Sequence, residues 1–165
     1  MHYLISDKTS PLGREIVVQD RQAGRCLFRA HGPVVRLRDE LRLDDAQGVE
    51  QLWIKEPMLG DRKTVELLRS GQRCATLRMF TVGNLLEGVD VDFVDGCKLH
   101  ARGDLVGHTY SVHGDTGLVA QVKPHKSHAL ELDTTAGQDE PVIVGVILAM
   151  SAMADAWARA VVQTR

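Results

Sequence analysis

The segment from residue 140 to residue 162, EPVIVGVILAMSAMADAWARAVV, is the part of the 165-residue chain that decides the fold. Between residues 141 and 154 it carries no charge, and Ser151 is its one polar side chain. Ala, Leu and Met are strong helix formers, Asp139 is a suitable N-cap, and Pro141 stands where its missing N–H does no harm. A helix that is apolar on every side has to be covered by other apolar groups.

Four surroundings could cover this helix: a lipid bilayer, a membrane surface, a groove on a partner, or the rest of the chain. A transmembrane helix needs about 20 apolar residues, whereas the uncharged run stops before Asp155. A helix that lies on a membrane surface needs one charged face, and this segment has none before Asp155. Small residues such as Gly145 and Ala149 suit a tight enclosure. We therefore favour a helix buried by its own protein over the other three.

The rest of the chain repeats one pattern, in which two β-rich runs flank a short turn that contains glycine. Glycine supplies the positive φ that such hairpin turns require. The recurrence at near-constant spacing favours an up-and-down antiparallel meander. The five turn glycines are Gly24, Gly48, Gly71, Gly96 and Gly117.

This pattern predicts about twelve strands, with longer loops at residues 57–61 and 83–88. A sheet of that size has open edges unless it closes, and a closed barrel of twelve strands has a wide lumen to fill. The predicted fold is therefore mainly β, a closed antiparallel barrel of about twelve strands around a hydrophobic C-terminal helix, in a single domain spanning residues 1–165. The strands are expected near 3–6, 14–20, 25–31, 34–43, 49–56, 64–69, 73–80, 89–95, 97–102, 108–113, 118–124 and 128–133.

The composition narrows the class of protein. The chain is 44% hydrophobic and 25% charged, with a net charge of -2, which indicates a globular protein and gives no reason to expect nucleic acid binding. Its three cysteines are scattered without a CxxC motif, which favours reduced thiols in a cytoplasmic protein. The first residues lack the basic and apolar regions of a secretory signal, and no cofactor is expected.

Four stretches are informative when taken together: YLISDKTSPLGREIVVQDRQAGRCLFRAHG (3–32), VVRLRDELRLDDAQGVEQLWIKE (34–56), GHTYSVHGDTGLVAQVKP (107–124) and DEPVIVGVILAMSAMADA (139–156). They resemble the LURP-one-related family, which has a tubby C-terminal-like fold and is related to the phospholipid scramblase family. The resemblance implies a twelve-stranded barrel wrapped around a central helix. Through the tubby and scramblase relatives it also implies binding to membrane lipids or phosphoinositides. The chain lacks a cysteine cluster and a proline-rich N-terminal arm, so lipid scrambling is not expected.

Basic residues around two predicted connections form the candidate lipid-binding site. Arg and Lys are the usual donors to phosphate groups. The alternative is an ordinary solvated strand face, because acidic residues such as Asp39 and Glu56 are interspersed with these cations. The candidate residues are Arg36, Arg38, Lys55, Arg62 and Lys63.

Histidines suggest a second hypothesis. Three converging imidazoles could bind zinc, but no two of these residues have the i,i+4 spacing of a helical site, so exposed or edge-strand histidines are the other interpretation. The five clustered histidines are His100, His108, His113, His125 and His128.

In the apolar helix, Asp155 is expected to pair with Arg159 one turn later.

The sequence thus predicts a non-enzymatic binding module, cytoplasmic and peripheral at the membrane. Its expected partners are an anionic phospholipid or phosphoinositide, or a membrane-associated protein, with no nucleic acid and no transmembrane span. Two alternatives stay open: a metal- or histidine-dependent hydrolase, and a protein-interaction module without lipid binding. Replacing Leu148 with arginine is expected to abolish folding if the helix is central.

Overall fold

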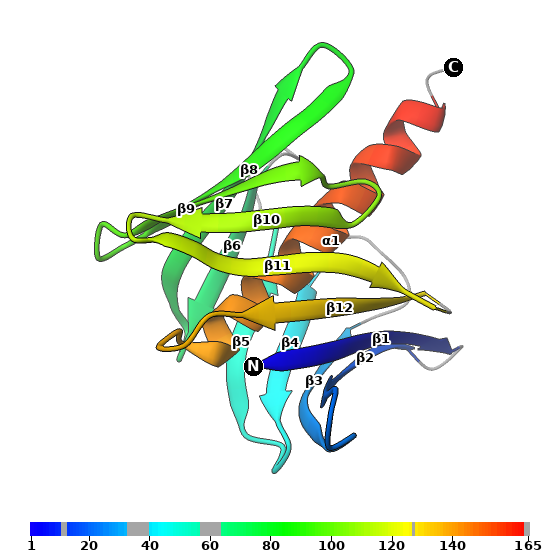
Figure 1. Cartoon of the computed structure of the whole chain (residues 1–165), viewed down its shortest axis with the longest axis vertical. Helices are drawn as coiled ribbons and strands as arrows, with labels where there is room; N and C mark the ends of the chain where they lie inside the picture. The colour runs from blue at the N-terminus through cyan, green and yellow to red at the C-terminus, as the bar shows by residue number, and fades with distance from the viewer. Residues whose placement is uncertain (11–12, 33–39, 57–63, 127, 164–165) are drawn as a thin grey trace.

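The computed structural model describes residues 1–165 except 11–12, 33–39, 57–63, 127 and 164–165, and omits the side chains of residues 9, 10 and 163. Twelve strands are followed by one helix, as the sequence predicts (Figure 1). The elements are β1 (His2–Ser10), β2 (Gly13–Asp20), β3 (Cys26–Gly32), β4 (Glu40–Asp45), β5 (Glu50–Lys55), β6 (Thr64–Arg69), β7 (Gln72–Val82), β8 (Leu85–Phe93), β9 (Lys98–Asp104), β10 (Thr109–Gly114), β11 (Gly117–His125), β12 (Ala129–Thr134) and α1 (Glu140–Gln163).

The strands form a closed barrel in which each strand pairs with its neighbours in the chain and β1 pairs with β12. The closing ladder is antiparallel and aligns His2 with Asp133. Side chains alternate between the inside and the outside, as in β8, where Val89 and Val91 are buried while Asp92 is exposed. The predicted closed antiparallel barrel is confirmed. Closure removes the free sheet edges that would otherwise invite aggregation.

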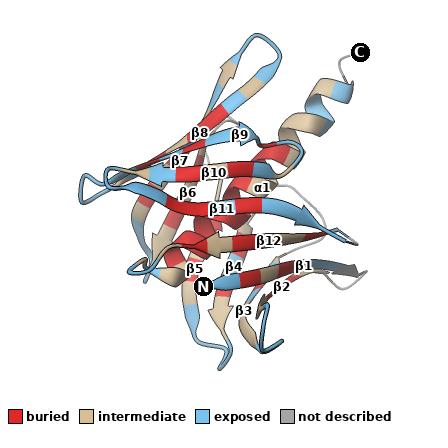
Figure 2. Cartoon of the chain, viewed as in Figure 1, coloured by how far each residue is buried: buried red, intermediate tan, exposed pale blue. Residues whose placement is uncertain are grey.

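Helix α1 runs through the lumen, and the buried residues of the strands face it (Figure 2). The side chains of Val144, Ile147 and Met150 are fully buried. By length and composition α1 is apolar enough to cross a membrane, yet 61% of its most apolar window is buried inside the barrel. We infer that the apolar segment is the core of this domain, as the sequence favours.

The start of α1 is tied to the strands by polar contacts. The Tyr3 hydroxyl donates to Glu140 Oε2 at 2.5 Å, and the Thr134 hydroxyl donates to the same carboxylate at 3.1 Å. Burial raises the pKa of Tyr3, and the Glu140 carboxylate raises it further. Asp139 precedes the first helical residue as predicted, and its carboxylate pairs with Arg69 at 2.8 Å.

One predicted loop is wrong. Residues 83–88 form a tight turn followed by strand, because β8 begins at Leu85 and this residue pairs with Val82 of β7. The β7–β8 pair is therefore longer than the sequence suggests. The expected strand at 34–43 is seen only as β4, since residues 33–39 lie outside the described residues, as does the predicted loop at 57–61.

Candidate functional site: the exit end of the barrel

The two ends of the barrel differ in what they carry. In an up-and-down barrel the connections alternate between the ends, so those that follow the odd-numbered strands share one end. The C-terminal part of α1 leaves the barrel at this end, because Asp155 contacts His108 in the β9–β10 turn. We call it the exit end. The opposite end holds the N-terminus and the start of α1 (Figure 1).

The structure describes only one of the five predicted lipid-binding residues. Lys55 ends β5 at the exit end, is partly buried, and lies opposite Glu40 and Glu66 in the ladders. The other four, Arg36, Arg38, Arg62 and Lys63, lie outside the described residues. The described residues that flank their segments, Gly32, Glu40 and Thr64, stand at strand ends on the exit side.

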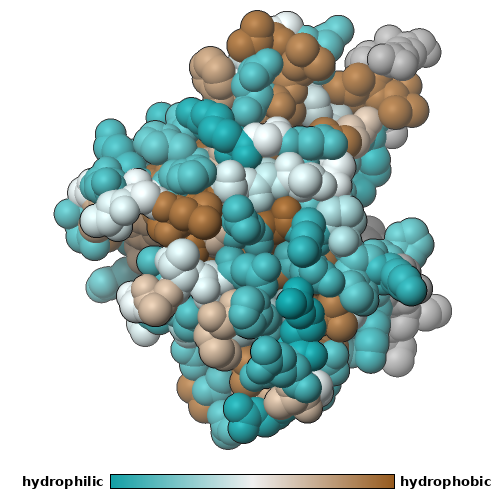
Figure 3. All heavy atoms as spheres, in the orientation of Figure 1, coloured by the Kyte–Doolittle hydropathy of each residue, from teal (hydrophilic) through white to brown (hydrophobic). Residues whose placement is uncertain are grey.

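An exposed apolar surface projects from the exit end. Phe80, Val82 and Leu85 stand together around the β7–β8 turn, and we call these three residues the hairpin tip. Their exposed fractions are 52%, 56% and 66%. Val162 is exposed in the last turn of α1. Figure 3 shows apolar surface at both projections, which extend in the same direction along the longest axis of the molecule.

This surface was not predicted from the sequence. The signal that could have found it is the run of residues 79–86, MFTVGNLL, in which apolar side chains occur on both faces of the hairpin. On a strand that covers a core, one face is polar, so an apolar outer face is unusual. Large apolar side chains at the opposite end occur singly on separate segments, for example Val49 and Val94. Isolated exposed apolar residues are normal on protein surfaces.

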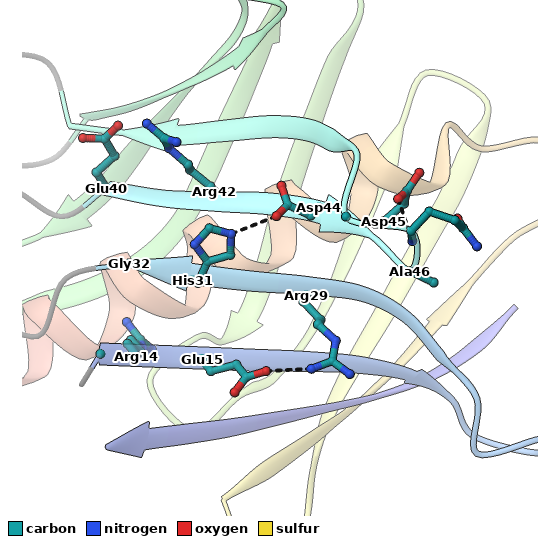
Figure 4. A pocket seen from close by; sticks show the side chains of 13 residues that line it. Arg14, Glu15, Arg29, His31, Gly32, Glu40, Arg42, Asp44, Asp45 and Ala46 are labelled. Carbon is teal, nitrogen blue, oxygen red and sulfur yellow. Dashed lines mark hydrogen bonds and ion pairs between the residues drawn. The ribbon is translucent and has the colours of Figure 1, made fainter. Parts of the chain in front are cut away.

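A hollow of about 1060 Å³ lies on the outer face of β2, β3 and β4 (Figure 4). Its charges compensate each other: Arg29 binds Glu15 at 3.0 Å, and His31 contacts Asp44 at 2.8 Å. The guanidinium of Arg42 stacks over the ring of Trp53, 4.1 Å from its centroid. This groove is therefore a solvated, ion-paired sheet face and a weaker candidate for binding an anion.

The five histidines are distributed around the barrel: three of them pair with carboxylates, whereas His113 contacts the hydroxyl of Ser111. His100 contacts Asp90 at 2.8 Å and His125 contacts Glu131 at 2.8 Å. No group of three possible metal ligands occurs in the part of the chain that the structure describes. Histidines that are close together in the sequence therefore do not converge on a metal centre within those residues, because successive strands spread their side chains around the barrel.

The expected pair between Asp155 and Arg159 is wrong. Asp155 instead lies 3.3 Å from His108 Nε2, and Arg159 is exposed. The β9–β10 turn brings His108 to the helix through a positive φ of 58°, a backbone geometry that the strand pattern does not reveal. The pairing of a helix residue with a distant turn is a tertiary contact, which helical spacing alone does not predict.

We expect the carboxylates of these surface pairs to make the fold sensitive to acid. The hydrogen bond from His125 lowers the pKa of Glu131, and Lys123 and Arg21 lower it further. Partial burial raises the pKa of Asp90, but the hydrogen bonds and charges of His100 and Arg102 lower it by more, so that the pKa is lowered overall.

A carboxyl whose pKa is lowered on folding stabilises the protein above its unfolded pKa, about 4 for these groups. That contribution disappears as the pH falls through the folded pKa. Urea unfolding at a series of pH values should show nearly constant stability from neutrality to about pH 5 and a steady loss below about pH 4. Glu131→Gln should lose part of this dependence, with Glu87→Gln as the control for removing an exposed charge.

Comparison with known proteins agrees with this architecture. The family model described as LURP-one-related matches residues 1–151. No curated protein sequence gives a significant match. The X-ray structure of a protein from Arabidopsis thaliana is similar in fold, with a TM-score of 0.62 and 16% identity over 90% of this chain and 89% of that one. Because the family model covers most of the length and the barrel with its central helix is present, the chain belongs to the LURP-one-related family.

Proposed function

We propose that the protein is a non-enzymatic binding module that docks onto an anionic membrane surface through the exit end of its barrel. The observation that carries this proposal is the hairpin tip, where three large apolar side chains project together into solvent. Exposed apolar clusters of this kind mark interaction sites. The helix fills the lumen, which leaves the outer surface and the ends of the barrel for binding.

The occupant we favour is a lipid surface because apolar and basic groups belong to the same end. Exposed Arg78 lies on β7 beside the hairpin tip, and exposed Arg159 lies near the end of α1. Arg36, Arg38, Lys55, Arg62 and Lys63 belong to β5 or to segments whose flanking strands end there. Apolar side chains that enter the interface and cations that meet anionic headgroups are the two usual contributions to peripheral binding.

The proposed location is the cytoplasm, with reversible attachment to a membrane. The three cysteines are free, which is consistent with a reducing compartment. Phosphoinositides are a possible target within the anionic lipids because several cations could meet one multiply charged headgroup. A protein partner at the same surface is the alternative outcome of the test below.

Flotation with vesicles tests the proposal directly. Vesicles of phosphatidylcholine alone, with phosphatidylserine, or with a phosphoinositide should be compared at low and high salt. We expect binding to the anionic vesicles, weakened by salt because the Debye length shortens from about 10 Å at 0.1 M to 3 Å at 1 M. Absence of binding to every vesicle would overturn the membrane proposal and leave a protein partner.

Paired variants sharpen the experiment. Phe80→Ser with Leu85→Ser should weaken binding about thirtyfold or more, since each apolar group contributes about 1 kcal/mol or more when buried. The matched control is Val49→Ser with Val94→Ser, because these side chains are similarly exposed, at 57% and 65%, but lie at the opposite end. Equal binding by the two double variants would contradict docking through the exit end.

The basic residues are tested in the same assay. Arg62→Ser with Lys63→Ser should reduce binding to anionic vesicles by about thirtyfold, at about 1 kcal/mol for each charge near the membrane. Exposed Arg73 and Lys98 lie in the first two residues of β7 and β9 at the opposite end, so Arg73→Ser with Lys98→Ser is the control with equal loss of charge.

A further inference from the structure

A cavity of about 630 Å³ opens beside α1 at the exit end, and we call it the mouth cavity. It lies between the helix, the first two strands and the β11–β12 turn. Its apolar wall includes Ile5, Ile16 and Leu148, all buried. A volume of this size is in the range of pockets that hold small organic ligands.

Two polar side chains that line the mouth cavity have buried atoms without a partner. Neither Nδ1 of His108 nor Oγ of Ser151 makes a hydrogen bond within the described protein. The hydroxyl of Tyr110 is also buried without a partner, although Tyr110 does not itself line the mouth cavity. Burial raises the pKa of Tyr110, and Ser151 lies near enough to oppose this rise, but the two hydroxyls do not reach hydrogen-bond geometry. Buried polar groups left in this state are costly and normally have a partner.

Apart from His128, which is exposed on the rim, the charged and titratable side chains that line the mouth cavity each lie beside a group that can match them. Arg14 binds Asp7 at 2.9 Å, and His108 Nε2 lies 3.3 Å from Asp155. His125, on the rim, contacts Glu131 at 2.8 Å. A ligand with a net charge would have to compete with these pairs, whereas an uncharged polar group would not. The unpartnered atoms therefore favour a ligand whose polar group is uncharged.

The hydrogen-bonding pattern specifies the head further. Nε2 of His108 faces Asp155 at 3.3 Å, so Nδ1 is the ring nitrogen left for a ligand; it accepts a hydrogen bond when the ring is neutral and donates one when the ring is protonated. The Ser151 hydroxyl both donates and accepts. A ligand hydroxyl has the same two capacities, so it can pair with Nδ1 in either state of the ring and also exchange a hydrogen bond with Ser151.

We propose that the mouth cavity binds an uncharged single-chain amphiphile, with its hydroxyl head at His108 and Ser151 and its apolar chain along the wall formed by Ile5, Ile16 and Leu148. The chain removes apolar wall from water, which provides the affinity. The head satisfies the unpartnered atoms, which provides the selectivity. This site goes beyond membrane docking, because the hairpin tip does not line the cavity.

Calorimetric titration without vesicles tests the proposal, with three probes of equal chain length used as monomers. These are 1-monooctanoylglycerol as the uncharged probe, octanoate as the anion and octylamine as the cation. We expect saturable binding of the uncharged probe and at least tenfold weaker binding of both ions. Failure of the uncharged probe to bind, or tighter binding of either ion, would overturn the proposal.

Ser151→Ala is the decisive variant because it removes one unpartnered hydroxyl without adding bulk. Its affinity for monooctanoylglycerol should fall about tenfold, while its thermal midpoint without ligand should stay equal or rise. Ala129 is buried on the cavity wall, so Ala129→Phe should abolish binding while circular dichroism reports a retained barrel. The control is Ser111→Ala, whose hydroxyl contacts His113 instead.

Two outcomes separate this site from the proposed function. Phe80→Ser with Leu85→Ser should bind monooctanoylglycerol as the unchanged protein does, even though it loses vesicle binding. Unchanged affinity in Ser151→Ala would show that the amphiphile binds elsewhere and would overturn the mouth-cavity assignment, whatever the flotation result.

Discussion

Replacement of Ile147 by arginine should prevent the protein from folding. Ile147 is fully buried where α1 passes through the barrel, so the new charge would have no water and no partner. Leaving a charge unpaired in a protein interior costs roughly 3–5 kcal/mol, against a total stability of about 5–15 kcal/mol for a typical domain. We expect the variant to accumulate in inclusion bodies or to show no cooperative thermal transition.

The position of the charge matters as much as the residue. Leu148 is also buried, but it borders the mouth cavity, where an arginine head could reach water. The sequence predicts that Leu148→Arg abolishes folding, but because of this position we expect it to be less damaging than Ile147→Arg, although still destabilising. Val162→Arg is the control, since Val162 is 71% exposed at the end of the same helix. A native-like thermal midpoint for Ile147→Arg would be incompatible with a helix enclosed by the barrel.

A second large effect is expected at Gly145, where α1 packs closely against Leu52 of β5. A Cβ atom at this position would lie 2.6 Å from Cδ1 of Leu52, a side chain that is itself fully buried. Gly145→Leu should destabilise the protein by about 3 kcal/mol or more, because overpacking of this kind typically costs 1–3 kcal/mol per misfit and the larger side chain adds further clashes. Leucine is a strong helix former, so the loss cannot come from helix propensity.

Urea unfolding of four proteins would isolate this contact: the unchanged chain, Gly145→Ala, Leu52→Ala and the double variant. Gly145→Ala alone should destabilise the protein, whereas in the Leu52→Ala background it should stabilise, because the added methyl enters the space that Leu52 vacates. Ala160→Leu, at an exposed position of α1, is the control and should change stability little. Additive effects of the two alanine substitutions would show that Gly145 and Leu52 do not pack together.

The fold was accessible from the sequence because it follows from short-range patterns. Turn glycines such as Gly24 and Gly71 mark hairpins through their positive φ, and the observed values are 68° and 76°. The uncharged stretch of α1 has to be buried by other apolar groups, and the lumen of a twelve-stranded barrel has to be filled. A helix inside the barrel meets both requirements. The misplaced start of β8 arose because Gly88 looked like part of a loop, whereas it lies in the β8 ladder opposite Arg102 of β9.

The candidate site was less accessible, because it depends on which segments meet at one end of the barrel. Phe80 and Leu85 are exposed because the β7–β8 hairpin extends beyond the neighbouring strands. The pairing of His108 with Asp155 joins residues far apart in the chain. Neither fact has a local signature that single-sequence patterns could supply.

The sequence alone determined the class of the fold, because alternation, turn chemistry and the apolar helix are local properties of the chain. It also identified the basic residues Arg36, Arg38, Lys55, Arg62 and Lys63, whose role remains a prediction. Only the tertiary structure decided that the hairpin tip, the end of α1 and the mouth cavity share the exit end. The physical reason is that barrel closure and register, which are cooperative results of many side-chain contacts, set the neighbours of each surface residue.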